Sequence, residues 1–204
     1  MLYGIWDVTV PLLIHIIVSN VMVLLLGNRV DPAFLTTAAA AVTLPVLLLL
    51  YRDDRKGQPS EKVSVPWWVY PLMAVGGVIL NQLLSAVMNS FAVTEHFSNA
   101  AQEGLLGSGF LTQLIGLGIL VPLMEELLFR GLVYQRMKKY FPVKISILLA
   151  AAVFALYHGN MVQILFAFPM ALVMLLAYEK WKSLTVPVVF HMAVNLSTVI
   201  LHVW

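Results

Sequence analysis

The sequence predicts an all-α, polytopic integral membrane protein, a helical bundle of about seven transmembrane helices. The first observation behind this fold class is composition: 61% of the 204 residues are hydrophobic and only 11% are charged, whereas a soluble domain is about half apolar and about a quarter charged. The second is a mean hydropathy of +0.91. The third is that apolar runs long enough to cross a bilayer recur along the whole chain.

The apolar runs define the expected spans, each roughly 17 to 25 residues long. They cover residues 8–26, 33–51, 67–90, 109–130, 145–160, 162–178 and 185–203. The start, MLYGIWDV, lacks the basic residues and cleavage site of a signal peptide, so we expect the first run to be a retained membrane helix. No internal repeat is apparent, and residues 52–62 form the only polar linker of any size. We therefore expect residues 1–204 to form a single membrane domain.

The loop charges predict an orientation. Lysine and arginine gather in loops 52–62 and 131–144 and in the turn after the sixth span, whereas loop 91–108 contains neither. Basic loops mark the cytoplasmic side, which predicts the N-terminus inside and the C-terminus outside, in the cell's inner (cytoplasmic) membrane. The lipid bilayer is then the expected surrounding. A net charge of +2 is too small to favour a nucleic-acid partner, and the absence of cysteine excludes disulfides and thiolate metal sites.

Two adjacent acids stand in the apolar stretch VPLMEELLFR, residues 121–130. Glu126 and Arg130 are four residues apart, so on a helix they share a face and can pair. A structural ion pair accounts for those two residues. Glu125 points about 100° away and needs its own partner. Neighbouring acids in a low dielectric resist joint ionisation. A carboxylate whose proton affinity is raised in this way suits a general base that later acts as an acid.

Two histidines and an amide lie in other spans. His191 and Asn195 share a helix face. Counted inward from the basic loops, Glu125 and His158 each lie about 20 Å deep, and His191 about 14 Å. The common depth predicts one water-filled cavity, open to the cytoplasm. The structural alternatives are a packing role for His158 and a helix–helix hydrogen bond for Asn195. We interpret His15, whose only nearby polar companion is Asn20, as structural or interfacial.

A carboxylate, two imidazoles and an amide around one cavity favour hydrolytic chemistry. One hypothesis is a divalent metal, zinc being the best fit, held by Glu125, His158, His191 and Asn195. The metal would activate water and polarise a carbonyl group. The other is a metal-free mechanism, in which Glu125 activates water with His158 while His191 and Asn195 stabilise an oxyanion. The sequence leaves both open.

Three motifs occur in order on separate predicted helices. They are E-E-x-x-x-R (Glu125, Glu126, Arg130), F-x-x-x-H (Phe154, His158) and H-x-x-x-N (His191, Asn195). The ordered set resembles the CAAX-protease and bacteriocin-processing family (the CPBP or Abi family) of intramembrane metalloproteases, which includes the type II CAAX prenyl endopeptidase. The resemblance covers residues 109–198, a catalytic core. It assigns no function to residues 1–108.

The resemblance implies a hydrolase, an intramembrane CAAX-type endopeptidase acting on a membrane-associated protein or peptide that is prenylated in some members. It implies that Glu125 activates water, that His158 is a catalytic or metal-binding residue, and that His191 and Asn195 are metal or transition-state partners. Glu126 completes the catalytic set in a supporting role. Arg130 supports Glu126, and Phe154 packs beside His158.

Two further functions remain as alternatives. A non-catalytic membrane immunity or scaffold protein of the same fold would keep the site residues for structure and would tolerate loss of the Glu125 carboxylate. An ion- or proton-coupled carrier would use membrane acids and histidines as a relay. Carriers are typically built from repeats with broken helices in both halves. The missing repeat and the crowding of polar residues into the second half rank the carrier last. The substrate and the oligomeric state are left undetermined.

Overall fold

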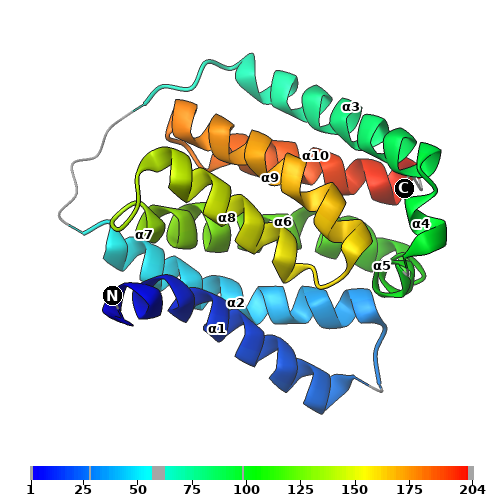
Figure 1. The fold of residues 1–204 in the computed structure, drawn as a ribbon. Coiled ribbons are helices and arrows are strands. Elements are labelled where there is room, and N and C mark those ends of the chain that lie inside the picture. Colours follow the sequence, from blue (N-terminus) through cyan, green and yellow to red (C-terminus); the bar gives the residue numbers. More distant parts are fainter. Residues whose placement is uncertain (1, 28, 57–62, 98, 202–204) are drawn as a thin grey trace.

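The computed structural model describes residues 2–27, 29–56, 63–97 and 99–201, and within these ranges it contains helices and no strand (Figure 1). The all-α prediction is therefore confirmed. The long helices outside the centre are α1 (Leu2–Leu26), α2 (Pro32–Asp54), α3 (Val69–Ser90), α8 (Val143–Tyr157), α9 (Met161–Trp181) and α10 (Thr185–Leu201). Two short helices, α4 (Val93–His96) and α5 (Ala100–Leu106), lie in the stretch for which we expected only a loop.

One continuous helix runs through the middle of the bundle. It comprises the segments η1 (Thr112–Leu120), α6 (Val121–Glu126), η2 (Leu127–Tyr134) and α7 (Gln135–Met137), of which η1 and η2 are π-helical. We call it the central helix. It continues past residue 130, where the predicted fourth span ends, so Arg136 lies on the helix rather than in a loop.

Five helices in the described ranges are long and apolar enough to cross a membrane: α1, α2, α3, the central helix and α9. Helices α8 and α10 are shorter apolar helices. Helix α8 has 15 residues, which corresponds to about 22 Å, less than the roughly 30 Å of a hydrocarbon core. The expected bundle of apolar helices is present, with its fifth and seventh members shorter than a typical span.

The helices pack in pairs around the central helix. Helix α1 packs along α2, α3 along α10, and α8 along α9. Figure 1 shows α1 and α2 along one side of the bundle and α3 along the other. The central helix contacts α1, α2, α8 and α10, so the two acids of its motif lie where the pairs meet.

Two glycines let the central helix approach its neighbours closely. A Cβ atom at Gly116 would collide with the side chain of Thr37 on α2, and one at Gly118 would lie 2.5 Å from Leu196 on α10. Small residues at helix interfaces allow such approach in membrane bundles. These contacts fix the position of the central helix along its own axis relative to α2 and α10.

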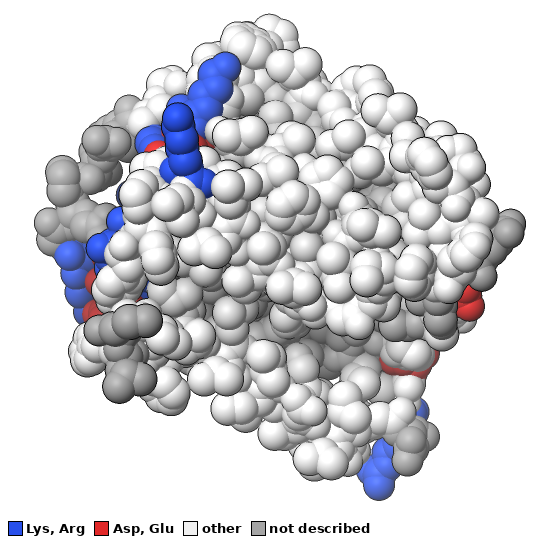
Figure 2. Space-filling model, in the orientation of Figure 1, with Lys and Arg blue, Asp and Glu red and all other residues white. Residues whose placement is uncertain are grey.

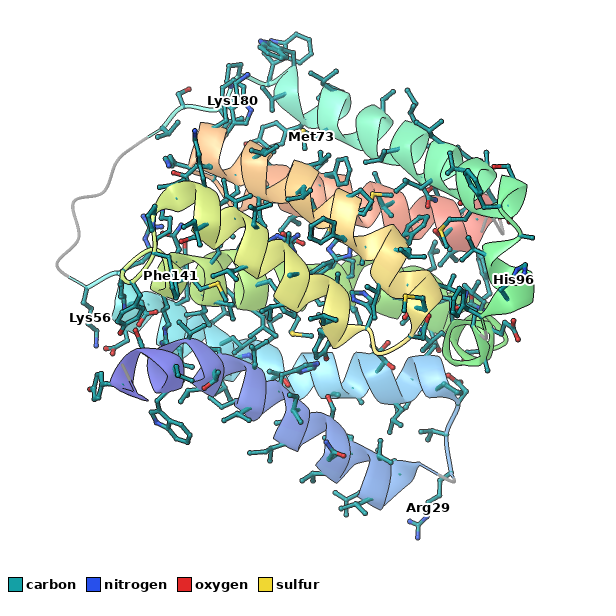
Figure 3. The ribbon with its side chains drawn as sticks, in the orientation of Figure 1. Arg29, Lys56, Met73, His96, Phe141 and Lys180 are labelled. Atoms are coloured by element: carbon teal, nitrogen blue, oxygen red, sulfur yellow. The ribbon has the colours of Figure 1, made fainter. Side chains whose placement is uncertain are left out.

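The two ends of the bundle differ in charge. One end, which we call the basic end, holds the described lysines and arginines apart from Arg29 and Arg130. These are Arg52, Arg55, Lys56, Arg136, Lys138, Lys139, Lys144, Lys180 and Lys182. The opposite end holds α5, the start of α9 and the end of α10, and we call it the α5 end. Figure 3 shows Lys56 and Lys180 at one end and His96 at the other.

Ion pairs tie the helices together at the basic end. Arg136 donates from Nε to Asp54 on α2 at 2.7 Å and from Nη1 to the carbonyl oxygen of Asp7 on α1 at 2.8 Å. Glu179 on α9 accepts from Tyr134 at 2.6 Å and from Lys138 at 3.1 Å. Between the two ends, the face in Figure 2 is largely uncharged, as a lipid-facing surface requires.

Candidate active site

A cavity of about 410 Å³ lies inside the bundle. Its lining includes the four residues that the sequence suggested as an active site, namely Glu125, His158, His191 and Asn195, from three separate helices. The shared cavity expected from their depth is therefore present. Glu126, Arg130 and Phe154 lie behind its wall, where Glu126 and Arg130 have no exposed surface at all.

Glu126 anchors both a charge and a ring. Its Oε1 accepts from Arg130 Nη1 at 2.9 Å, which is the pair that the four-residue spacing predicts, and it also lies 2.7 Å from His191 Nδ1. Because a carboxylate only accepts, His191 must donate its Nδ1 proton to Glu126. Neutral His191 therefore keeps its lone pair on Nε2.

Glu125 meets that second nitrogen. Its Oε2 lies 3.6 Å from His191 Nε2, and its side chain lines the cavity while being only slightly exposed. His191 thus stands between two glutamates, of which Glu126 is buried against Arg130 and Glu125 faces the cavity. This is the separate partner that Glu125 was expected to need, and it comes from α10 rather than from a neighbour on its own helix.

Arg130 completes its environment with an aromatic ring. Its Nε and Nη2 have no hydrogen-bond partner among the described residues, and the guanidinium instead lies 4.4 Å from the ring centroid of Phe154. The same ring packs edge-on against His158 at 5.0 Å and against His191 at 5.9 Å. Phe154 therefore packs beside His158 as expected, and it also links the arginine to both histidines.

His158 stands where α8 ends. Its backbone closes the helix, and its Nδ1 lies 2.9 Å from the carbonyl oxygen of Phe154. Because that oxygen only accepts, Nδ1 carries the proton and Nε2 keeps a lone pair in the neutral ring. Gly159 follows at a φ of +75°, a left-handed conformation that glycine adopts without strain. This turn leads directly into α9.

Asn195 donates a hydrogen bond to a carbonyl group of the central helix that has no donor within that helix. In η1 the N–H of Val121 donates to the carbonyl of Gly116, five residues earlier. The next residue, Pro122, has no N–H, so in this register the carbonyl of Leu117 has no helical donor. Asn195 Nδ2 donates to it at 2.9 Å. Asn195 thus makes the helix–helix hydrogen bond that we expected as the structural alternative, and it also lines the cavity.

The predicted metal ligands do not assemble into a metal site. Glu125 and His191 are close enough to share an ion, but in the described part of the chain no group of three or more histidine, cysteine, aspartate or glutamate side chains could hold one. Catalytic zinc sites use three protein ligands at about 2.0–2.2 Å. The set Glu125, His158, His191 and Asn195 as arranged therefore does not fit zinc, and we derive no step through a metal.

The cavity extends toward the α5 end, which differs from our expectation. The remaining lining residues include Gln102 and Leu106 of α5, Met88 near the end of α3, Gln163 in the first turn of α9 and Thr198 near the end of α10. We expected an opening on the basic, cytoplasmic side. The sequence argument used only depth from the basic loops, and depth near the middle of a bilayer is compatible with either side. The orientation of the chain itself stays a prediction.

Sequence reasoning missed a third histidine in the lining of the cavity. His15 of α1 lies in the same cavity as Glu125 and His158, although we interpreted it as structural. On α1 only Ser19, one turn further along, contacts the ring in the described part of the chain, with its Oγ 3.5 Å from His15 Nε2, and such a pair does not by itself indicate a site. That His15 lines the same cavity as the other two histidines becomes visible only once α1 is packed on α2.

Comparison with known proteins agrees with the motif region. Residues 107–197 match the family described as type II CAAX prenyl endopeptidase Rce1-like. No curated protein and no solved structure matches the chain. The matched region contains the central helix with its paired glutamates, both motif histidines, and the cavity wall that they form. Residues 107–197 are thus a domain of the Rce1-like type II CAAX prenyl endopeptidase family.

Proposed function

We propose that this protein is an intramembrane endopeptidase that hydrolyses a peptide bond in a membrane-associated protein or peptide, prenylated substrates being among the candidates. The observation that carries the proposal is the pair of Glu125 and His191, 3.6 Å apart, on the wall of a cavity inside an apolar bundle. Ionisable groups in such surroundings are costly and typically functional.

The proposed reaction starts with water in the cavity. Glu125 takes a proton from the water while the water oxygen bonds to the carbonyl carbon of the peptide. The C–N bond then breaks, and the same proton passes to the leaving nitrogen, which departs as an amine. Glu126 supports this cycle indirectly, because it fixes the tautomer of His191 in which the Nε2 lone pair faces Glu125. Once Glu125 has taken the proton, His191 Nε2 can accept a hydrogen bond from it.

Two other residues have roles that follow from their free atoms. His158 commits Nδ1–H to the Phe154 carbonyl, so its Nε2 accepts a hydrogen bond from the water and orients it. Asn195 uses one amide hydrogen on Leu117, which leaves the second to donate to the developing oxyanion. Both assignments are extensions of the proposal, since they depend on a substrate bound in this cavity.

The side of entry is part of the proposal. The cavity reaches toward the α5 end, and basic loops mark the cytoplasm, so we propose that substrate enters from the non-cytoplasmic side. The chain has no cysteine, which allows single-cysteine variants to be labelled without background. With a membrane-impermeant maleimide on intact cells, E103C on α5 and Q163C on the cavity wall should react, and K139C only after permeabilisation. Reaction of Q163C only from the side of K139C would contradict this entry route.

The hydrolytic step is tested by Glu125→Gln, which keeps the side-chain size and removes the base. We expect cleavage to fall by about 10²–10⁴-fold. The measurement compares membrane-peptide products by mass spectrometry between wild type and variant at equal membrane abundance. Glu103→Gln, the same change at an exposed position on α5, is the matched control and should leave the products unchanged.

Two further outcomes of this assay separate the alternatives. Identical product profiles for wild type and Glu125→Gln would remove the general base and favour the non-catalytic scaffold. Because the described ligands do not form a zinc site, prior treatment with a chelator should leave the products unchanged. Loss of products on chelation, with recovery on adding zinc, would instead support the metal hypothesis.

A further inference from the structure

His15 is held in the same manner as the two histidines of the family motifs. His191 donates from Nδ1 to Glu126 at 2.7 Å, and His158 donates from Nδ1 to a carbonyl oxygen at 2.9 Å. His15 Nδ1 lies 3.0 Å from Thr43 Oγ1, a fully buried hydroxyl on α2. All three rings line one cavity, yet His15 comes from a helix outside the matched residues 107–197.

The tautomer of His15 follows from Thr43. The threonine hydroxyl has one hydrogen, and it donates that hydrogen to the carbonyl oxygen of Ala39 at 2.7 Å. Thr43 can therefore only accept from His15, so Nδ1 of His15 carries the proton and Nε2 keeps its lone pair. The nearest described partner of Nε2 is Ser19 Oγ at 3.5 Å, the upper limit of a hydrogen bond. A buried acceptor so weakly bonded is available to a ligand.

His15 and His158 both pack against the ring of Tyr157. The ring of His15 contacts Tyr157 at 5.9 Å, and Tyr157 in turn contacts His158 at 6.1 Å. The order along this wall is thus His15, Tyr157 and then His158. A bound peptide in extended form would meet His158 and Glu125 at the scissile bond and His15 further along its backbone, where N–H groups are the available donors.

We propose that His15 is a substrate-binding residue, whose Nε2 accepts a hydrogen bond from a backbone N–H of the bound peptide. This inference rests on the proposed function, since it assigns the peptide to that same cavity. It extends the site onto α1, a helix outside the matched residues 107–197. In this role His15 binds the peptide and takes no proton in the reaction.

The first test needs no substrate. Diethyl pyrocarbonate modifies unprotonated imidazole nitrogens that water can reach, and peptide mapping locates the modified rings. In the folded protein in detergent micelles, we expect His15 to react together with the exposed His96. Unmodified His15 beside modified His96 would overturn the proposal, because its Nε2 would then be closed to the cavity. Thr43→Val removes the acceptor that orients the His15 ring. It should change the rate at which the reagent modifies His15 and leave the rate at His96 unchanged.

The second test uses the peptide whose cleavage depends on Glu125. His15→Phe keeps a ring of similar size and should raise KM about tenfold while kcat stays within about twofold. His15→Gln retains an acceptor oxygen and should recover part of the lost affinity. An unchanged KM in both variants, or a fall in kcat alone, would overturn the binding role.

The two tests also separate this inference from the proposed function. Reactive His15 without any Glu125-dependent cleavage would refute hydrolysis, and the binding role with it, while leaving an accessible imidazole in the cavity. Glu125-dependent cleavage with unreactive His15 would refute the inference alone. A melting temperature close to that of wild type shows that each variant is folded.

Discussion

The central helix and α1 are both apolar helices of similar length, yet they occupy opposite environments. In the most apolar 18-residue window of each, 67% of the residues are buried in the central helix and 17% in α1. The central helix contacts helices on several sides, whereas α1 rests mainly on α2. Mean hydropathy runs opposite to burial, since it is 2.3 for α1, the less buried helix, and 1.5 for the central helix.

The difference shows what each kind of helix requires. A peripheral helix needs only an apolar surface toward lipid and a few polar contacts inward. In α1 these include His15 to Thr43 and Asp7 to Arg136. The central helix can carry glycines, two acids and an arginine because these residues are buried inside the bundle, where Glu125 faces the cavity. Lower mean hydropathy at higher burial is therefore the mark of the functional helix in this bundle.

The comparison predicts its largest effect at the buried ion pair. Arg130→Met leaves Glu126 as an unpaired charge with no exposed surface, so we expect a loss of about 3–5 kcal/mol in the free energy of unfolding. Denaturant titration in detergent micelles measures it. Lys138→Met removes a partly exposed partner of Glu179 and should cost only about 0–1 kcal/mol. Equal losses in the two variants would contradict the distinction between core and basic end.

A smaller effect is expected where the central helix touches α2. Gly116→Ala adds a Cβ that collides with Thr37, whose hydroxyl would have to leave the carbonyl oxygen of Ala33 at 2.7 Å. We expect a loss of about 1–3 kcal/mol in the free energy of unfolding. Gly76→Ala on α3 is the matched control, because apart from its chain neighbours and the backbone of its own helix no atom lies within 4 Å of the added carbon. It should be neutral or gain up to about 1 kcal/mol from helix propensity. The reverse order would mean that α2 does not pack as described.

The smallest effect is expected on the lipid-facing side of α1. Leu24 is 84% exposed, whereas Leu128 of the central helix is fully buried. Leu24→Ala should change the free energy of unfolding by less than about 0.5 kcal/mol, and Leu128→Ala should lower it by about 2–5 kcal/mol. Thermal unfolding of both variants in the same detergent makes the comparison. A large loss from Leu24→Ala would indicate that α1 packs against a second protein surface.

Local rules predicted much of the candidate site. The four-residue spacing of Glu126 and Arg130 predicts their pair, and the common depth of Glu125, His158 and His191 predicts a shared cavity. Other features escaped. No apolar periodicity predicts the two π-helical segments or the short helix α5. It also does not predict that Pro122 leaves the carbonyl of Leu117 without a helical donor.

What the sequence alone determined is the class of protein, its apolar helices and the family motifs, because apolarity and spacing are properties of short stretches of chain. Only the tertiary structure decided which acid faces the cavity, that His15 joins it, and that it extends toward the α5 end. Those features depend on the rotation and height of each helix against its neighbours. Rotation and height are set by contacts such as Gly116 on Thr37 and Asn195 on Leu117, between residues far apart in the chain.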